Sequence, residues 1–458
     1  AGANGRDGQL EGDPMKTALS QLGQRTASPA ISWLMSLTLG QPQLISLAAG
    51  FTDNASLPVE EARALLDEIF ASPRTGQAAL QYGSTAGDPL LRELTAKRLT
   101  ELDSRAPARA GDLQSPSEPS ARNQAATASR RHMPSPLSPD RLLITHGSQQ
   151  LLYLLTEALC DPGDIVLVED PTYFVYLGIA QSHGLRCRGV RLLPDGLDLA
   201  HLEQVLEELR RSGGLPRVKL LYLVTYYQNP TGYTTSFAKK AAALQLLRRY
   251  ERFAGHPLYL LEDAAYRELR FAGEDIPSAL AAPGGAERVL YAGTFSKPFA
   301  TGIRVGFGVL PEPVLTTATR IKGNHDFGTA NLLQQILTRA LCMGAYERHL
   351  DALRRRYATK AGVMTDALSG SLAGADLTFV YGVGLAWDPA TVFADLGARV
   401  QCHSDLEVLA DAVVRAARPG DQLLVMSNGS FGGLHGRLLE GLARGDADAD
   451  QGPGIRAT

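Results

Sequence analysis

Apolar segments that end in short polar motifs occur three times in the middle of the chain, and this pattern constrains the fold more than any other feature. The run 142–144 precedes Thr145-His-Gly-Ser-Gln-Gln150, which is followed by a helical pattern. The run 218–224 precedes Tyr227-Gln-Asn-Pro-Thr-Gly232 and another helical pattern, and a third apolar run ends at Asp263. Buried strands alternating with helices indicate an α/β fold.

Each motif has a side chain or backbone suited to one part of a phosphorylated pyridine. A strand that ends in a small-residue turn at a helix N-terminus presents free N–H groups, so Gly147-Ser148-Gln149 is predicted to cradle a phosphate. Asn229, fixed by the following turn, can hydrogen-bond a ring hydroxyl oxygen. The Asp263 carboxylate can pair with a pyridine nitrogen and keep it protonated.

A fourth segment, Gly293-Thr-Phe-Ser-Lys-Pro-Phe-Ala-Thr-Gly-Ile-Arg-Val-Gly306, places Lys297 between small hydroxyl residues and ahead of Arg304. A lysine amine condenses with an aldehyde to a Schiff base, while hydroxyls and a guanidinium neutralise a phosphate. The alternative is a surface lysine in a glycine-rich loop, which a lone Ser-Lys pair would favour. The three other motifs favour Lys297 as the attachment point of pyridoxal phosphate.

In these motifs the chain resembles the fold-type I aminotransferases, in the branch that contains 2-aminoadipate and kynurenine aminotransferases. The resemblance covers roughly residues 28 to 370. It implies an α/β fold-type I transferase dependent on pyridoxal 5'-phosphate (PLP), with a mostly parallel, seven-stranded type of central sheet. It also implies a homodimer that uses a small-molecule amino acid and a 2-oxo acid as substrates.

The resemblance assigns roles at matching positions. The catalytic set is Lys297, as Schiff-base lysine and proton shuttle, Asp263, as partner of the pyridine nitrogen, and Tyr173 in Glu169-Asp-Pro-Thr-Tyr173, as the ring stacked on the pyridine. The remaining implied cofactor contacts are Asn229 and Tyr266 on the ring hydroxyl; Ser148, Gln149, Thr294, Ser296 and Arg304 on the phosphate; and Tyr82 on the phosphate of the neighbouring subunit. The implied substrate contacts are Gly50, which ends the segment from Leu47, together with Asn229 and Tyr82.

Structural alternatives remain open for single positions. Asp263 could be a helix cap, Tyr173 a core aromatic residue and Asn229 a plain turn residue. Their joint occurrence in this order favours transamination between a 2-amino acid and a 2-oxo acid through a Lys297 Schiff base. In that reaction the freed lysine amine removes the substrate α-proton and must be neutral to do so.

The amino-acid composition excludes several classes of partner and cofactor. The net charge of −3 argues against a nucleic-acid partner. The four cysteines, Cys160, Cys187, Cys342 and Cys402, are scattered without a C-x-x-C pair, so we expect neither a metal nor a disulfide framework. Apolar runs long enough for a membrane span and a signal-peptide pattern are absent, which predicts a cytoplasmic protein.

The predicted organisation has four parts. Residues 1–27 form a disordered lead, and residues 28–373 form the cofactor-binding domain. Within that domain the Ala-, Ser-, Pro- and Arg-rich segment 104–139 is a disordered insertion, because it lacks periodicity and a sizeable apolar content. Residues 374–445 form a βα segment with a parallel sheet, and residues 446–458 form a disordered tail.

The C-terminal part departs from the aminotransferase pattern, because an Asn-x-x-Arg-Leu-x-Phe segment with the arginine that grips the substrate carboxylate is missing. The stretch 426–439 instead resembles the C-terminal end of UDP-N-acetylmuramate tripeptide ligases, although an ATP-binding Gly-x-x-x-x-Gly-Lys-Ser/Thr motif is absent. The alternative function is therefore a PLP-binding but catalytically impaired fusion protein, unless Arg437 or another residue replaces the clamp. Ser32 stands where relatives with acidic substrates often have arginine, which favours aromatic or aliphatic amino acids.

Overall fold

The computed structural model describes residues 18–28, 32, 52–105, 137–374, 377–381, 394–418 and 434–449. Its strands are β1 (Leu142–Thr145), β2 (Ile165–Asp170), β3 (Arg186–Leu193), β4 (Gly196–Leu197), β5 (Val218–Val224), β6 (Tyr259–Asp263), β7 (Val289–Thr294), β8 (Gly306–Val309), β9 (Thr378–Tyr381) and β10 (Val400–His403). The larger helices are α3 (Val59–Ile69), α4 (Pro73–Leu80), α5 (Pro89–Arg105), α6 (Gly147–Leu159), α7 (Phe174–Ser182), α8 (Leu199–Arg211), α9 (Phe237–Ala254), α11 (Val314–Asp326), α12 (Asn331–Cys342), α13 (Ala345–Gly374), α15 (Leu406–Ala416) and α16 (Leu434–Ala449).

The main sheet has the order β1-β8-β7-β6-β5-β2-β3-β4. Strand β8 runs antiparallel to β1 and β7, β4 runs antiparallel to β3, and the other neighbours are parallel. The expected mostly parallel α/β sheet is confirmed, and the eighth strand is the two-residue β4 at one edge. The parallel strands therefore bring their carboxyl ends to one edge of the sheet.

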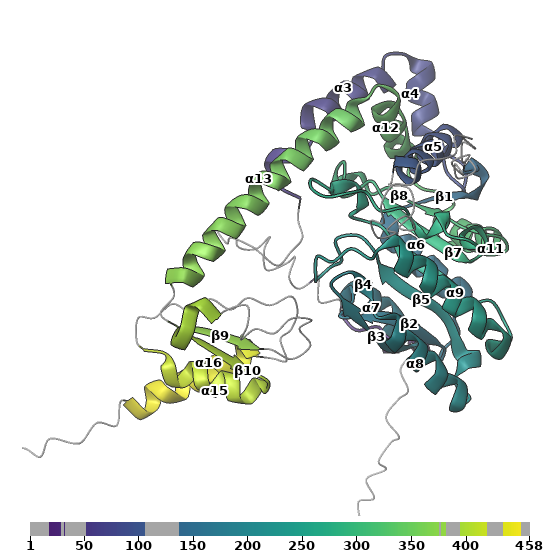
Figure 1. Cartoon of the computed structure of the whole chain (residues 1–458). Helices are drawn as coiled ribbons and strands as arrows, with labels where there is room; N and C mark the ends of the chain where they lie inside the picture. Colours follow the sequence, from purple (N-terminus) through teal and green to yellow (C-terminus); the bar gives the residue numbers. More distant parts are fainter. Residues whose placement is uncertain are drawn as a thin grey trace, which may run out of the picture.

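Helices cover both faces of this sheet, as Figure 1 shows. Side chains of β5 alternate between two apolar clusters, since Leu221 and Leu223 pack with α8 and α9 whereas Leu220 and Tyr222 pack with α6, α7 and α11. A third cluster joins β1 and β8 to α3, α4, α5 and α12. This double burial explains why the central strands are apolar throughout rather than alternating.

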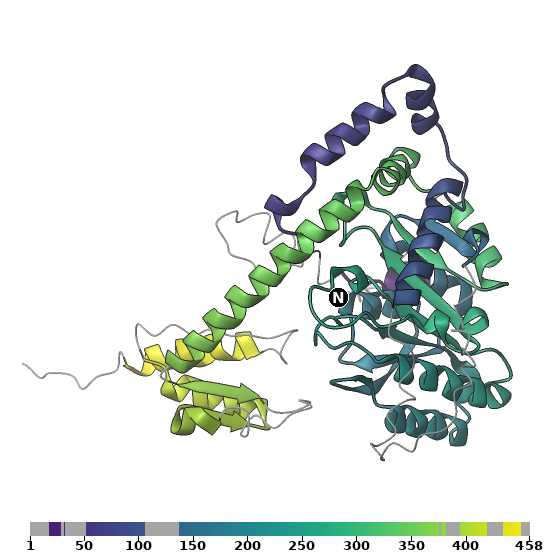
Figure 2. The ribbon, with the colours of Figure 1, turned by 45° about the horizontal axis from the view of Figure 1, so that its top comes forward.

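Helix α13 leads from the sheet domain to a small C-terminal unit at its far end (Figures 1 and 2). In that unit β9 pairs in parallel with β10, and α15 and α16 enclose a separate apolar cluster of Leu409, Ala410, Val413, Leu434 and Leu438. The parallel pair agrees with the predicted βα alternation. Most of the ligase-like stretch, residues 426–433, lies outside the described residues, so that resemblance stays a prediction.

Two of the predicted segment boundaries differ from the helices seen in the structure. Within the predicted lead of residues 1–27, residues 21–25 form the short helix α1, because Ser20 caps it and Arg25 Nε donates to the carbonyl of Ser182 at 3.2 Å. Helix α16 extends to Ala449, beyond the predicted limit at 445. Most of the insertion, residues 106–136, lies outside the described ranges.

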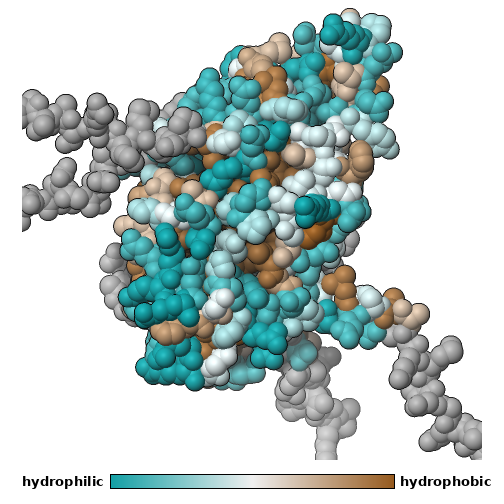
Figure 3. All heavy atoms as spheres, turned by 90° about the vertical axis from the view of Figure 1, so that its right-hand side faces the viewer, coloured by the Kyte–Doolittle hydropathy of each residue, from teal (hydrophilic) through white to brown (hydrophobic). Residues whose placement is uncertain are grey.

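The face of the molecule in Figure 3 is mostly hydrophilic, with patches of apolar side chains between the polar ones. Within the described ranges, every helix is too short or too polar to span a membrane. The described residues also contain no cluster of three or more His, Cys, Asp or Glu side chains that could hold a metal ion.

Candidate active site

The predicted motifs meet at the carboxyl edge of the sheet. Thr145 at the end of β1 and Thr294 at the end of β7 both pair with Gly306 at the start of β8. Val224 at the end of β5 pairs with Asp263 at the end of β6, which in turn pairs with Ala292. Ligands in open α/β sheets bind at such an edge.

The phosphate-cradle motif and Arg304 lie against each other. A Cβ atom added at Gly147 would stand 2.8 Å from Nη2 of Arg304, and one added at Gly306 would stand 2.4 Å from the backbone nitrogen of Ser148. Gly147 has φ +73°, which favours glycine, and it begins helix α6. The helix N-terminus and the guanidinium thus form a compact anion site, with Ser148 half-buried beside it.

Lys297 follows the buried end of β7. The backbone N–H of Ser296 donates to Oγ1 of Thr294 at 3.1 Å, while Oγ of Ser296 is buried without a hydrogen-bond partner in the structure. Burial, reinforced by the positive charge of Arg304, lowers the pKa of Lys297. A larger fraction of the amine is therefore neutral at a given pH, and the neutral amine is the form that condenses with an aldehyde and accepts a proton.

Asp263 is buried at the end of β6 and is held by two donors. The hydroxyl of Tyr222 donates to Oδ2 at 2.9 Å, and the backbone N–H of Ala265 donates to Oδ1 at 3.2 Å. Burial raises the pKa of Asp263 to about 6, although both hydrogen bonds act to lower it. Pairing with a protonated ring nitrogen would stabilise the charged form of this buried carboxylate.

Asn229 and Tyr266 lie next to each other in the structure. Nδ2 of Asn229 donates to the Tyr266 hydroxyl at 3.5 Å, and burial raises the pKa of Tyr266. Tyr173 stands at the start of α7, and burial raises its pKa, with smaller contributions from neighbouring Tyr266 and Asp263. Tyr173 and Tyr266 both pack against the apolar cluster that contains Tyr222, the hydrogen-bond partner of Asp263, so Tyr173 lies on the same side of the sheet as these residues.

Two predicted residues, Tyr82 and Gln149, are exposed rather than buried with this cluster. Tyr82 is 81% exposed and packs its ring edge-on against Phe327, with ring centroids 5.2 Å apart. Gln149 is exposed on the first turn of α6. Gly50 lies outside the described residues. Arg437 pairs with Glu407 inside the C-terminal unit.

Sequence reasoning missed Tyr222, Glu169 and Gln228, which lie directly behind the predicted residues. Glu169 and Gln228 are buried and hydrogen-bond each other at 3.4 Å. A signal for Glu169 exists, because a charged residue directly follows the apolar run Ile165–Val168 at a strand end. Tyr222 is one more large side chain in an apolar strand, so its contact with Asp263 has no local signal.

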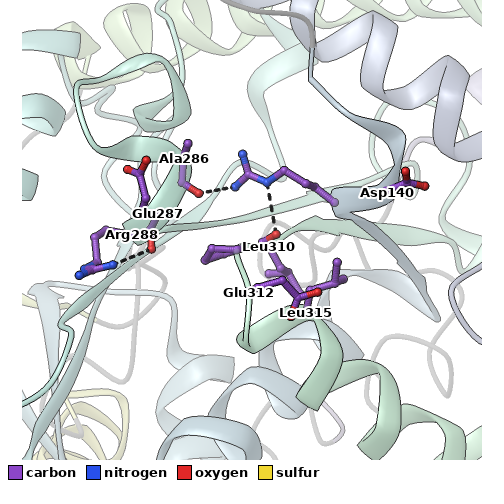
Figure 4. A pocket seen from close by; sticks show the side chains of 9 residues that line it. Asp140, Ala286, Glu287, Arg288, Leu310, Glu312 and Leu315 are labelled. Atoms are coloured by element: carbon purple, nitrogen blue, oxygen red, sulfur yellow. Dashed lines mark hydrogen bonds between the residues drawn. The ribbon is translucent and has the colours of Figure 1, made fainter.

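A surface pocket of about 550 Å³ lies at the opposite edge of the sheet, beside the starts of β1 and β7 and the end of β8. Arg141 lines this pocket and donates to the carbonyls of Ala286 and Leu310, both of which are labelled in Figure 4. The pocket also contains Glu287 and Glu312. Because the motif residues lie at the other ends of these strands, this pocket is separate from the candidate site.

Pyridoxal phosphate fits the residues at the carboxyl edge. The cradle of Gly147, Ser148 and Arg304 suits its phosphate, and Asp263 suits its ring nitrogen. The buried Oγ of Ser296 has no hydrogen-bond partner within the protein, and a bound phosphate can supply one. The Lys297 amine suits its aldehyde. The fit rests on donors, acceptors and charge that the fold already brings together.

Comparison with known proteins supports the same cofactor. The family model for aminotransferase class I and II matches residues 42–384. A 2-aminoadipate transaminase of Thermus thermophilus is 30% identical over 346 residues, which are 75% of this chain and 74% of that protein.

Solved structures are similar as well. The kynurenine aminotransferase of Pyrococcus horikoshii, in complex with PMP, has a TM-score of 0.64 at 28% identity, covering 77% of this chain and 76% of its own. The α-aminoadipate aminotransferase LysN of Thermus thermophilus, complexed with N-(5'-phosphopyridoxyl)-L-leucine, has a TM-score of 0.60 at 29% identity, with the same coverage of 77% and 76%. The chain therefore belongs to the class I and II aminotransferase family and is a pyridoxal-phosphate-dependent aminotransferase.

Proposed function

We propose that the protein transfers an amino group between a 2-amino acid and a 2-oxo acid, with Lys297 holding pyridoxal phosphate as a Schiff base. The observation that carries this proposal is the meeting of three groups at one sheet edge. These groups are the half-buried amine of Lys297, the anion site of Gly147 and Arg304, and the buried carboxylate of Asp263. Each matches one functional group of the cofactor.

When bound, pyridoxal phosphate supplies an electron sink for cleavage of the substrate Cα–H bond. Arg304 and the N-terminus of α6 would hold the phosphate, and Asp263 would keep the ring nitrogen protonated. Tyr222 orients Asp263 through its hydrogen bond. Asn229 and Tyr266 would bind the ring hydroxyl, and Tyr173 would lie against the ring. The neutral Lys297 amine would accept the proton from the substrate Cα and return it during amino transfer.

We assign aromatic or aliphatic 2-amino acids as the amino donors. Ser32 is an exposed, uncharged residue and offers no cation to an acidic side chain. Among the similar structures, one is a kynurenine aminotransferase, and another is complexed with a phosphopyridoxyl derivative of leucine. These two ligands support donors with aromatic or aliphatic side chains, whereas the second protein is named for α-aminoadipate, whose side chain is acidic.

We also infer a cytoplasmic homodimer in which Tyr82 contacts the cofactor phosphate of the partner subunit. The exposure of the adjacent Tyr82 and Phe327 rings supports this role, because aromatic side chains are enriched at protein interfaces. All four cysteines are free thiols, which agrees with a reducing compartment.

Reduction with borohydride tests the central assignment. The wild-type protein incubated with pyridoxal phosphate should absorb in the visible range and retain one covalently attached cofactor per chain after reduction. Lys297→Ala should retain none while keeping its fold by circular dichroism. Attachment at a single site in Lys297→Ala would show that another lysine carries the cofactor.

A further inference from the structure

We propose that Glu169 and Gln228 form a buried clamp that fixes the Tyr173 segment against the Asn229 turn, and that both are positioning residues for the cofactor ring. The inference rests on the proposed function, in which Tyr173 and Asn229 contact the ring and its hydroxyl. Neither Glu169 nor Gln228 is assigned a contact with cofactor or substrate. Their effect on the reaction is through the residues they hold.

The side-chain amide of Gln228 makes four hydrogen bonds and connects the loop after β2 with the Asn229 turn. Its Nε2 donates to the carbonyl of Pro171 at 2.8 Å and to Glu169 at 3.4 Å. Its Oε1 accepts from both the backbone N–H and the hydroxyl of Thr231, each at 2.8 Å. The side chain is 2% exposed, so water does not replace these bonds. Pro171 lies two residues before Tyr173, and Asn229 follows Gln228 directly.

Glu169 extends the clamp to strand β5. Its Oε2 accepts from the backbone N–H of Val224 at 3.0 Å as well as from Gln228. Because Val224 pairs with Asp263, and Tyr222 two residues earlier donates to Asp263, this bond fixes the end of the strand that supports the ring-nitrogen partner. Glu169 therefore links the Tyr173 segment, the Asn229 turn and the end of β5, the three segments assigned to the cofactor ring.

The charge state of Glu169 suits a positioning role. Burial raises its pKa to about 8, and the neighbouring charge of Asp263 acts in the same direction, whereas the bonds from Val224 and Gln228 oppose it. At neutral pH the group is mostly uncharged. It therefore accepts hydrogen bonds without adding a second negative charge beside Asp263, whose own charge is needed for the pyridine nitrogen.

Cofactor binding by the apo-protein tests the clamp. Gln228→Met removes the amide, and Glu169→Met removes the acceptor for Val224. Each should weaken pyridoxal phosphate affinity by roughly tenfold or more, because buried donors and acceptors lose their partners. Each should also alter the induced circular dichroism of bound cofactor, which reports how the ring sits against Tyr173. Glu169→Gln keeps an acceptor oxygen for Val224 and should restore affinity to within about threefold of wild type.

Glu251→Met is the matched control. Its carboxylate also accepts a backbone N–H, from Leu258 at 3.1 Å, but at the opposite edge of the sheet. This variant should lower thermal stability without changing cofactor affinity or the dichroism band. If Gln228→Met does not fold, Thr231→Val removes the hydroxyl that donates to Gln228 and accepts from the backbone N–H of Tyr233, while the Thr231 backbone N–H still binds Gln228. This variant should show the same spectral change with a smaller loss of affinity.

The outcomes separate the clamp from the proposed function. Folded Gln228→Met and Glu169→Met proteins with wild-type affinity and an unchanged dichroism band would overturn the clamp while leaving the Lys297 assignment intact. A wild-type protein that forms no Lys297-dependent visible band would instead refute the proposed function itself.

Discussion

The hydroxyl of Tyr222 donates a 2.9 Å hydrogen bond to Oδ2 of Asp263, and the two residues stand on adjacent parallel strands. Tyr222 is itself held by Tyr176, whose ring stacks on it with centroids 3.9 Å apart. Helix α7 therefore supports β5, and β5 supports the carboxylate assigned to the cofactor nitrogen. The orientation of Asp263 depends on packing as well as on its own strand.

Replacing Tyr222 should shift the pH dependence of cofactor binding. The pKa of Asp263, about 6, is held down in part by the Tyr222 hydrogen bond, so Tyr222→Phe should raise it. As the pH falls through this pKa, Asp263 takes up a proton and can no longer pair as a carboxylate with the protonated ring nitrogen. As the pH is lowered from 8 to 5, cofactor affinity should therefore begin to fall at a higher pH in Tyr222→Phe than in wild type. Identical pH profiles would show that the hydroxyl does not tune Asp263.

Stability of the apo-protein should depend on pH through Glu169. Its folded-state pKa of about 8 is above the ordinary value of 4.5, so between these limits the folded state keeps a proton that the unfolded state has lost. The group therefore reduces stability progressively as the pH rises from 4.5 to 8, by at most about 1.4 kcal/mol per pH unit. Glu169→Gln does not titrate, so its stability advantage over wild type should grow across this range and level off above pH 8. Melting temperatures of both proteins from pH 5 to 9 measure this, and a difference independent of pH would contradict it.

The sequence predicted the strand ends that carry the candidate residues, but not the side-chain contacts between strands. Asp263 ends β6 and the run 218–224 forms β5 as expected, because apolar runs bounded by polar turns are local signals. The contacts of Glu169 with Val224 and of Tyr222 with Asp263 depend on the order and register of β2, β5 and β6. Periodicity within one strand carries no information on which strand lies beside it.

Hybrid dimers should test the role of Tyr82. If Tyr82 serves the site of the partner subunit, neither Tyr82→Ala nor Lys297→Ala homodimers have a complete site. A heterodimer of the two variants would combine the intact Lys297 of one subunit with the intact Tyr82 of the other, and so contain one complete site. Co-expressed, differently tagged subunits should bind one reducible cofactor per heterodimer with wild-type affinity.

The same hybrid experiment distinguishes contributions within one chain. If Tyr82 acted on its own subunit, the site with an intact Lys297 would lack its tyrosine, and the heterodimer would bind cofactor as weakly as the Tyr82→Ala homodimer. A protein that stays monomeric and keeps full cofactor affinity on dilution would also contradict the shared site.

Removal of the C-terminal unit should separate cofactor binding from turnover. The assigned cofactor residues lie between Tyr82 and Arg304, and the apolar cluster around Leu409 and Leu434 is separate from the clusters of the sheet domain. A chain ending at Gly370 should therefore keep its fold and its affinity for pyridoxal phosphate. Its half-reaction with an amino acid should be slow and poorly saturable, because positioning of the substrate carboxylate requires groups beyond the cofactor site.

Single-turnover loss of the visible cofactor band with aromatic and aliphatic amino acids measures this effect in both chains. Saturation of the full-length protein at low substrate concentration, lost on truncation, is the expected result. Arg437→Ala in the full-length chain should leave that saturation unchanged, because Arg437 is paired with Glu407 inside the C-terminal unit. Equal half-reactions in the truncated and full-length chains would show that the C-terminal unit does not contribute to substrate binding. Slow, unsaturable reactions in both would favour the alternative of a cofactor-binding protein that lacks an effective carboxylate clamp.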